Sequence, residues 1–259
     1  MNKITKLSLV AMSLLTTLSA DILRIEGGAG VWIQNSSGES SYSNNGAVGK
    51  DTVTEQDLNK GYAWVLFKQP VPLIPNLRLE YTNIEYDGRV SGELDGFPGA
   101  IPDGYFSNSN LTMDQFDIIP YYNILDNTFW VTIDLGLDIK VLNTEYTAGS
   151  IIEPNTGLTI FEGYNDSAMS VIPLGYARAR VEIPTTDIGL ETDIKYISYD
   201  GSSITDFRAK LDYTLDMFPI VQPGLEIGYR YQKIDIDDGE GTLSNLEFSG
   251  LYAGIMVRF

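Results

Sequence analysis

Apolar and polar residues alternate along most of this chain, and helical periodicity is scarce. The segment 128–142 is the clearest case, because one of its faces carries Phe129, Val131, Ile133, Leu135, Leu137, Ile139 and Val141. The opposite face of the same segment carries Trp130, Thr132, Asp134, Gly136, Asp138 and Lys140. A period of two predicts a β-strand whose faces meet different surroundings.

Alternation alone fits either a soluble sandwich with an apolar core or a membrane barrel with an apolar exterior. The number of segments favours the barrel. We predict ten strands near 22–33, 58–69, 76–87, 112–124, 128–142, 166–183, 187–199, 204–215, 223–234 and 246–259. Six of the connections alternate between long and short: 34–57, 70–75, 88–111, 125–127, 143–165 and 184–186.

Long loops at one end and tight turns at the other are typical of outer membrane barrels. The fold class we expect is therefore all-β, a transmembrane antiparallel up-and-down barrel, with eight to twelve strands possible and ten favoured. The connection 200–203 departs from the pattern, because it is short where a long loop is expected. Pro120 and Pro173 fall inside predicted strands, where we expect a bulge or a local break. The sequence from Glu153 to Gly157 predicts the turn of a hairpin within the loop 143–165.

The first twenty residues have the composition of a secretory signal. Lys3 and Lys6 precede an apolar run from Leu7 to Leu18, and small residues follow at Ser19 and Ala20. A run of about 12 residues is too short to cross a hydrocarbon core of roughly 30 Å as a helix. We expect a signal peptide at 1–20, cleaved before Asp21, and a single barrel domain at 21–259.

Composition excludes several kinds of chemistry. The chain has no His and no Cys, so it has no Ser-His-Asp or Cys-His nucleophile, no His or Cys zinc site and no thiol redox centre. With 17 basic and 35 acidic residues the net charge is -18, which disfavours a nucleic-acid partner. We expect no cofactor and no metal site, and the acidic run 235–240 is more typical of a solvated turn than of a calcium loop.

The carboxyl terminus carries the most specific pattern. Phe259 ends the chain, and Val257, Ile255, Ala253 and Leu251 share its face. This resembles the last strand of bacterial outer membrane proteins, whose terminal aromatic residue is recognised by the barrel assembly machinery, although the third residue from the end is Val257 where Tyr is more usual. The whole chain resembles the small porin-like outer membrane proteins of Gram-negative bacteria, without the signature of a characterised subfamily.

The resemblance implies a place in the cell outer membrane, with both termini periplasmic. The expected partners are the lipid bilayer, lipopolysaccharide and, during biogenesis, the barrel assembly machinery, and the expected state is a monomer. Outer membrane proteases and phospholipases of comparable size depend on a histidine, which this chain lacks. The carboxylate pairs Asp134 with Asp138 and Glu191 with Asp193 are more typical of salt-bridge partners than of acid-base catalysts. We therefore expect no enzymatic activity.

On almost every predicted strand, the alternation assigns charged residues to the face that points into the lumen. The inward set comprises Arg24, Glu26, Arg78, Glu80, Asp117, Asp134, Asp138, Lys140, Arg178, Arg180, Glu182, Glu191, Asp193, Lys195, Arg208, Lys210, Asp212, Glu226, Arg230 and Arg258. Ten strands enclose little more space than their side chains fill. The set therefore predicts either a narrow charged channel for passive passage of small solutes or a closed barrel filled with salt bridges. In the closed alternative the acidic extracellular loops bind a surface partner.

Overall fold

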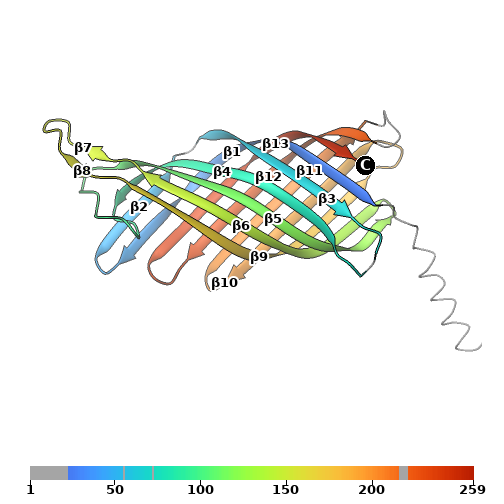
Figure 1. The fold of residues 1–259 in the computed structure, drawn as a ribbon, viewed down its shortest axis with the longest axis horizontal. Helices are drawn as coiled ribbons and strands as arrows, with labels where there is room; N and C mark the ends of the chain where they lie inside the picture. Colours follow the sequence, from blue (N-terminus) through green and yellow to red (C-terminus); the bar gives the residue numbers. More distant parts are fainter. Residues whose placement is uncertain (1–22, 55, 72, 216–220) are drawn as a thin grey trace, which may run out of the picture.

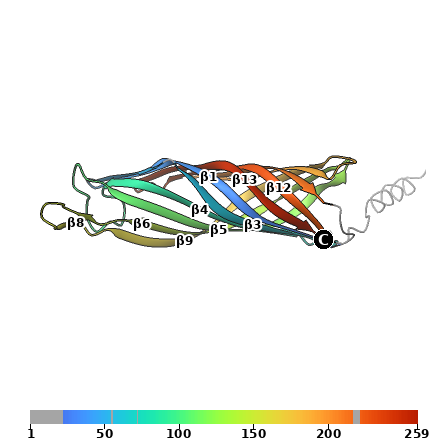
Figure 2. The same cartoon turned by 90° about the horizontal axis from the view of Figure 1, so that it is seen from above.

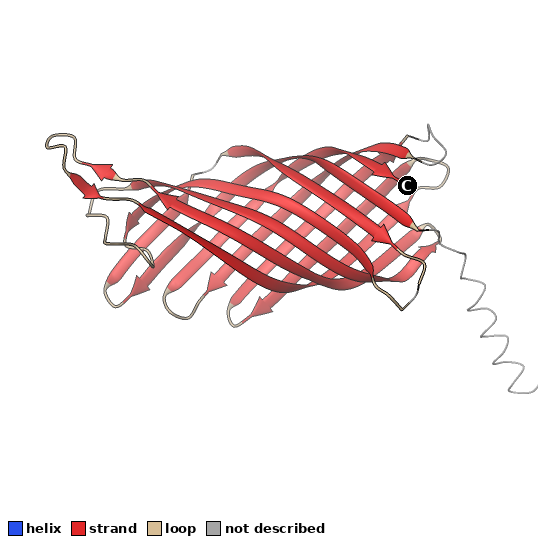
Figure 3. Cartoon of the chain, in the orientation of Figure 1, coloured by secondary structure: helices blue, strands red, loops and turns tan. Residues whose placement is uncertain are grey.

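The computed structural model describes residues 23–54, 56–71, 73–215 and 221–259. The expected signal peptide, its cleavage site and Asp21 lie outside these residues. All the elements described are strands (Figure 3). No helix in the described part of the chain is long and apolar enough to cross a membrane.

The strands form one closed antiparallel sheet (Figure 1). They are β1 (Arg24–Asn44), β2 (Ala47–Val53), β3 (Asp57–Lys68), β4 (Asn76–Gly92), β5 (Ser107–Thr128), β6 (Val131–Ala148), β9 (Tyr164–Glu182), β10 (Ile188–Tyr199), β11 (Ser202–Thr214), β12 (Gln222–Asp237) and β13 (Thr242–Arg258). Pairing of β1 with β13, from Glu26 opposite Arg258 to Tyr42 opposite Thr242, closes the barrel.

The barrel has ten strand positions, because β2 and β3 share one of them. Both pair with β1 on one side and with β4 on the other, β3 along the first half of β1 and β2 along its last residues. The prediction of a ten-stranded up-and-down barrel is confirmed.

The prediction of a long loop at 34–57 is wrong. β1 continues to Asn44, and a turn at Asn45 and Gly46 with positive φ at both residues leads directly into β2. Two successive residues with positive φ are typical of the tight turn that matches strand twist in a hairpin. The segment escaped prediction because its Ser, Asn and Gly residues show no apolar alternation. The predicted hairpin in the loop 143–165 is confirmed, since β7 (Ile151–Ile152) pairs with β8 (Thr159–Phe161).

No bulge lies at either strand proline, but the pairing is interrupted on one side of each, as the expected local break requires. Pro173 keeps its place opposite Ile139 in an unshifted ladder, and on its other side the β9–β10 pairing ends at Gly175. Pro120 lies opposite Leu77 in the β4–β5 ladder without a shift, while on its other side the β5–β6 pairing lapses between Ile118 and Tyr121. The register shifts of β5 lie further along, between Asn123 and Thr128.

The exterior of the barrel carries a belt of apolar side chains. On β6 the outward residues are Val131, Ile133, Leu135, Leu137, Ile139 and Val141, so the belt is eleven residues long on this strand. A tilted strand needs about 9–11 residues to cross the hydrocarbon core of a bilayer. The exterior therefore has the pattern of a membrane-spanning barrel.

The belt ends sharply at one level. Outward residues change from apolar to polar between Ile33 and Asn35 on β1, Tyr81 and Asn83 on β4, Phe116 and Asp114 on β5, Val141 and Asn143 on β6, and Tyr231 and Lys233 on β12. The strands continue past this boundary with polar outward faces. We call this part, which includes residues 35–44, β2, 83–92, 107–114 and 143–148, the outer extension. It lies at the end of the barrel opposite the start of β1 and the end of β13 (Figure 1).

Candidate functional site

The predicted inward charges meet inside the barrel. Seventeen of the twenty candidates, Asp117 among them, are at most 7% exposed. Arg24, Glu182 and Arg258 are more accessible and lie at the end of the barrel where β1 starts and β13 ends. Every strand position of the barrel contributes at least one polar group to this lumen.

Sequence reasoning missed one member of the set. Asp206 is 2% exposed and binds Arg230 through two hydrogen bonds of 2.7 and 3.0 Å. Asp206 is two residues before Arg208 on β11 and therefore points to the same face, so the alternation of the strand could have predicted its place in the lumen.

The inward charges form one connected network with Glu191 at its centre. The carboxylate of Glu191 lies 2.8 Å from Arg178, 3.2 Å from Arg78, and 3.3 Å from both Arg180 and Lys210. Four cations around one carboxylate compensate the loss of water that burial imposes on each charge.

Several of these contacts join strands on opposite walls of the barrel. Glu80 on β4 binds Lys195 on β10 at 2.6 Å and Arg208 on β11 at 2.7 Å. Lys140 on β6 lies 3.4 Å from Asp206 on β11. The barrel is flattened in cross-section, as the two views in Figures 1 and 2 show, and the flattening brings these walls within reach of single side chains.

An aromatic layer lies beside the charges. Glu226 accepts hydrogen bonds from the Tyr62 hydroxyl at 2.8 Å and the Trp64 indole at 3.0 Å. Lys210 lies 4.5 Å from the centre of the Trp64 ring, and Arg230 lies 5.0 Å from that of Trp32. These cation–π contacts join the ionic network to the rings.

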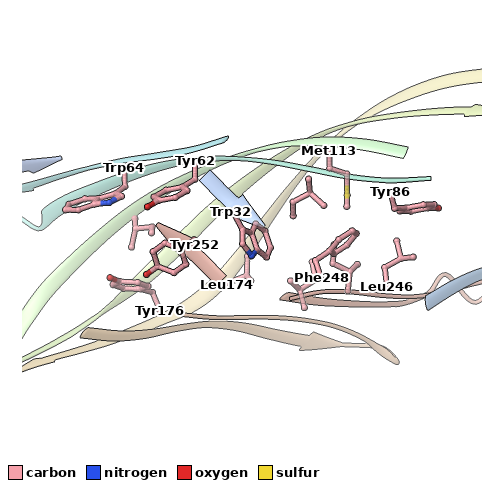
Figure 4. Close-up of a cluster of buried hydrophobic side chains, with 14 of the residues drawn as sticks. Trp32, Tyr62, Trp64, Tyr86, Met113, Leu174, Tyr176, Leu246, Phe248 and Tyr252 are labelled. Carbon is pink, nitrogen blue, oxygen red and sulfur yellow. The ribbon is translucent and has the colours of Figure 1, made fainter. Parts of the chain in front are cut away.

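Past the aromatic layer, at the level where the exterior becomes polar, the lumen turns apolar. Figure 4 shows Trp32 between the rings of Tyr62 and Trp64 on one side and Met113 and Phe248 on the other. The buried residues of this apolar layer are Ile84, Met113, Ile204, Ile234, Leu246 and Phe248, each at most 5% exposed. Charged and aromatic side chains, followed by apolar ones mixed with the buried Gln34, Gln115 and Gln232, thus fill the lumen.

The larger cavities lie at the two ends. One of about 500 Å³ opens beside Arg24, Lys68, Asp126 and Arg180, at the end where β1 starts. Another of about 250 Å³ lies in the outer extension. Between them, a void of about 10 Å³ is enclosed by Trp32, Tyr62, Arg208, Arg230 and Tyr252. That space corresponds to about one water molecule.

Three of the four carboxylates considered for acid-base chemistry are engaged in this network. Asp134 binds Arg178 at 2.5 Å, Asp193 binds Arg208 at 2.8 Å, and Glu191 has its four cations. Asp138 is the exception, because it lies 3.9 Å from the amine of Lys140 and neither of its buried oxygens accepts a hydrogen bond from a described residue. Within the described ranges, no group of three His, Cys, Asp or Glu residues is arranged to hold a metal ion.

Comparisons with known proteins find similarity to solved structures and none to a family model or a curated protein. Among solved structures, the outer membrane protease OmpT from Escherichia coli is similar with 9% identity and a TM-score of 0.49, over 93% of this chain and 97% of that one. The translocator domain of the autotransporter NalP from Neisseria meningitidis has 13% identity and a TM-score of 0.41, over 98% and 95% of the two chains. The toluene transporter TodX from Pseudomonas putida has 9% identity and a TM-score of 0.30, over 93% and 91%. The barrel assignment itself rests on the strand pairing.

Proposed function

We propose that this protein is a closed outer membrane barrel that acts by binding at its extracellular end. The observation that carries the proposal is the occupied lumen, in which salt bridges such as Arg208 with Glu80 join opposite walls. Such contacts leave little room for solutes. The competing prediction, a narrow porin-like channel, requires these pairs to separate at a cost in buried charge.

The exterior supports the membrane part of the proposal. The apolar belt has the length of a hydrocarbon core, and polar strands extend past it at one end only. Outer membrane barrels carry long extensions outside the cell and short turns in the periplasm. We therefore place the outer extension at the cell surface and both chain ends in the periplasm.

Planar-bilayer recording of the refolded protein tests the closed lumen. We expect almost no conductance, because the charged, aromatic and apolar levels block the path in succession. Flotation with liposomes, checked by the migration of the unboiled band, establishes that the protein has inserted. Regular conductance steps of uniform size from inserted protein would overturn the proposal in favour of the porin-like function.

The terminal residue provides a test of assembly. The backbone of Phe259 exchanges hydrogen bonds with that of Ile25, while its side chain is 54% exposed on the exterior. We expect Phe259→Ala to reduce the folded, heat-modifiable band in cells while hardly changing the urea midpoint of refolded protein. The reason is that assembly machinery reads the terminal ring, whereas the backbone bonds survive the substitution.

Leu251→Ala is the matched control for this test. Leu251 lies on the same strand and face and is 57% exposed, so its truncation removes a similar lipid contact without touching the terminus. Equal folded yields of the two variants in cells would show that Phe259 is an ordinary outward side chain.

A further inference from the structure

The cavity in the outer extension has aromatic walls. We call it the outer pocket. Its rings belong to Tyr42 on β1, Tyr86 on β4, Phe97 in the loop after β4, Tyr146 on β6 and Tyr164 on β9. Phe97 and Tyr164 pack with ring centres 4.9 Å apart, and Tyr146 lies 6.3 Å from Tyr164. Four strands and one loop thus hold the rings around one space of about 250 Å³.

The charges that line the outer pocket are all negative. Asp51, Asp95 and Asp166 contribute to its surface, and none of its described lining residues is Lys or Arg. This contrasts with the lumen, where cations and carboxylates are mixed. A ring face carries negative electrostatic potential, so the aromatic walls and the acids favour the same sign of ligand charge.

Asp51 is the most unusual of these acids. Its side chain is 1% exposed, and its carboxylate accepts hydrogen bonds from Ser109 at 2.8 Å, Tyr146 at 2.8 Å and Tyr86 at 3.5 Å. Across the described residues, it is the buried carboxylate that has no cation within salt-bridge distance. The nearest basic residue in sequence, Lys50, pairs with Glu39.

The hydroxyl groups compensate only part of the cost of burying this charge. Burial raises the pKa of the Asp51 carboxyl, and the hydrogen bonds from Ser109, Tyr146 and Tyr86 oppose that shift. A positive charge in the pocket would supply the missing compensation. The tyrosine hydroxyls that donate to Asp51 keep oxygen lone pairs with which they accept a hydrogen bond from an ammonium group.

We propose that the outer pocket binds an organic ammonium ion, an amine or methylated amine carried on a small apolar frame. The rings enclose the apolar part and attract the cation through their faces, while Asp51 provides the buried negative charge. This inference rests on the proposed function, since it identifies the ligand class that the extracellular end of the closed barrel binds. The apolar layer beneath the pocket separates it from the ionic lumen, so the ligand occupies a site and not the entrance of a pore.

The test measures binding of three probes to the protein refolded in lipid nanodiscs, by isothermal titration calorimetry. Phenethylammonium, 2-phenylethanol and phenylacetate share an aromatic frame and differ in charge. We expect phenethylammonium to bind about tenfold or more tightly than the neutral alcohol, and phenylacetate not to bind. Equal affinities for the amine and the alcohol would overturn the proposal.

Two variants assign the effect to the pocket. Asp51→Asn keeps the shape of the side chain and removes its charge, so we expect about tenfold or greater loss of phenethylammonium affinity and no change for the alcohol. Asp114→Asn is the matched control, because Asp114 also accepts a hydrogen bond from a tyrosine, Tyr81 at 2.7 Å, but faces outward. We expect it to bind phenethylammonium like the wild type.

The outcomes separate the two proposals. If Asp51→Asn folds, as judged by the unboiled band, and binds the amine unchanged, the pocket proposal fails and the closed barrel stands. If Asp51→Asn does not fold, Tyr164→Leu serves as the second variant, since it removes one ring and no charge, and unchanged amine affinity would again reject the pocket. Conductance steps from protein whose amine binding depends on Asp51 would instead support the pocket and reject the closed barrel.

Discussion

Replacing Glu191 by alanine is expected to lower the unfolding free energy of the refolded barrel by about 3–5 kcal/mol. Glu191 is buried and lies within 3.3 Å of Arg78, Arg178, Arg180 and Lys210. Removing its carboxylate leaves four cations close together with fewer negative partners, so their mutual repulsion and their desolvation are no longer offset. Urea titration followed by tryptophan fluorescence measures the loss.

Glu145→Ala is the control for this experiment. Glu145 lies on the outward face of β6 in the outer extension and is exposed, so its removal should change stability by about 0.5 kcal/mol or less. If the two alanine variants unfold at the same urea concentration, Glu191 is not the centre of a tight ionic network and the lumen is more hydrated than its contacts indicate.

An arginine in place of Leu135 is expected to destabilise the barrel by about 2–4 kcal/mol in a bilayer. Leu135 lies in the middle of the apolar belt on β6 and is 48% exposed on the exterior. In a membrane its surroundings are lipid, where a guanidinium group has no water and no counter-charge. Unfolding by urea in liposomes is the measurement.

Asn143→Arg makes the same charge change on the same strand and face, eight residues away and beyond the belt boundary. Its expected cost is about 0–1 kcal/mol, because that position meets the interface or water. Equal costs at the two positions would contradict the placement of the membrane on this exterior.

The alternation of side chains predicted much of this structure. Lys140 and Asp134 could be assigned to the lumen because a strand turns alternate residues to opposite faces, whatever their partners. The β1–β2 hairpin could not be predicted in the same way. Its outward face meets water at the level of Ser41 and Lys50, so polar residues occupy both faces and the period of two disappears.

The sequence also could not predict which charged residues pair with each other across the lumen. That Arg208 meets Glu80 depends on the flattening and on the stagger of ten strands around the barrel, which no single segment encodes. Asp51 escaped notice for a related reason. The hydroxyl groups that surround its buried carboxylate come from β4, β5 and β6, whereas its own neighbours in sequence are polar and give no sign of burial.

The contacts across the lumen also bear on how the chain folds and how long it stays folded. Lys195 and Glu80 are 115 residues apart, Arg208 and Glu80 are 128 apart, and Tyr62 and Glu226 are 164 apart. Contacts of such high sequence separation form late and slow folding, because a long loop must close before they are made. Interactions absent from the transition state slow unfolding without speeding folding. Once β13 has paired with β1, the ionic network therefore raises the barrier to unfolding. The lifetime of the folded barrel then depends on the height of that barrier.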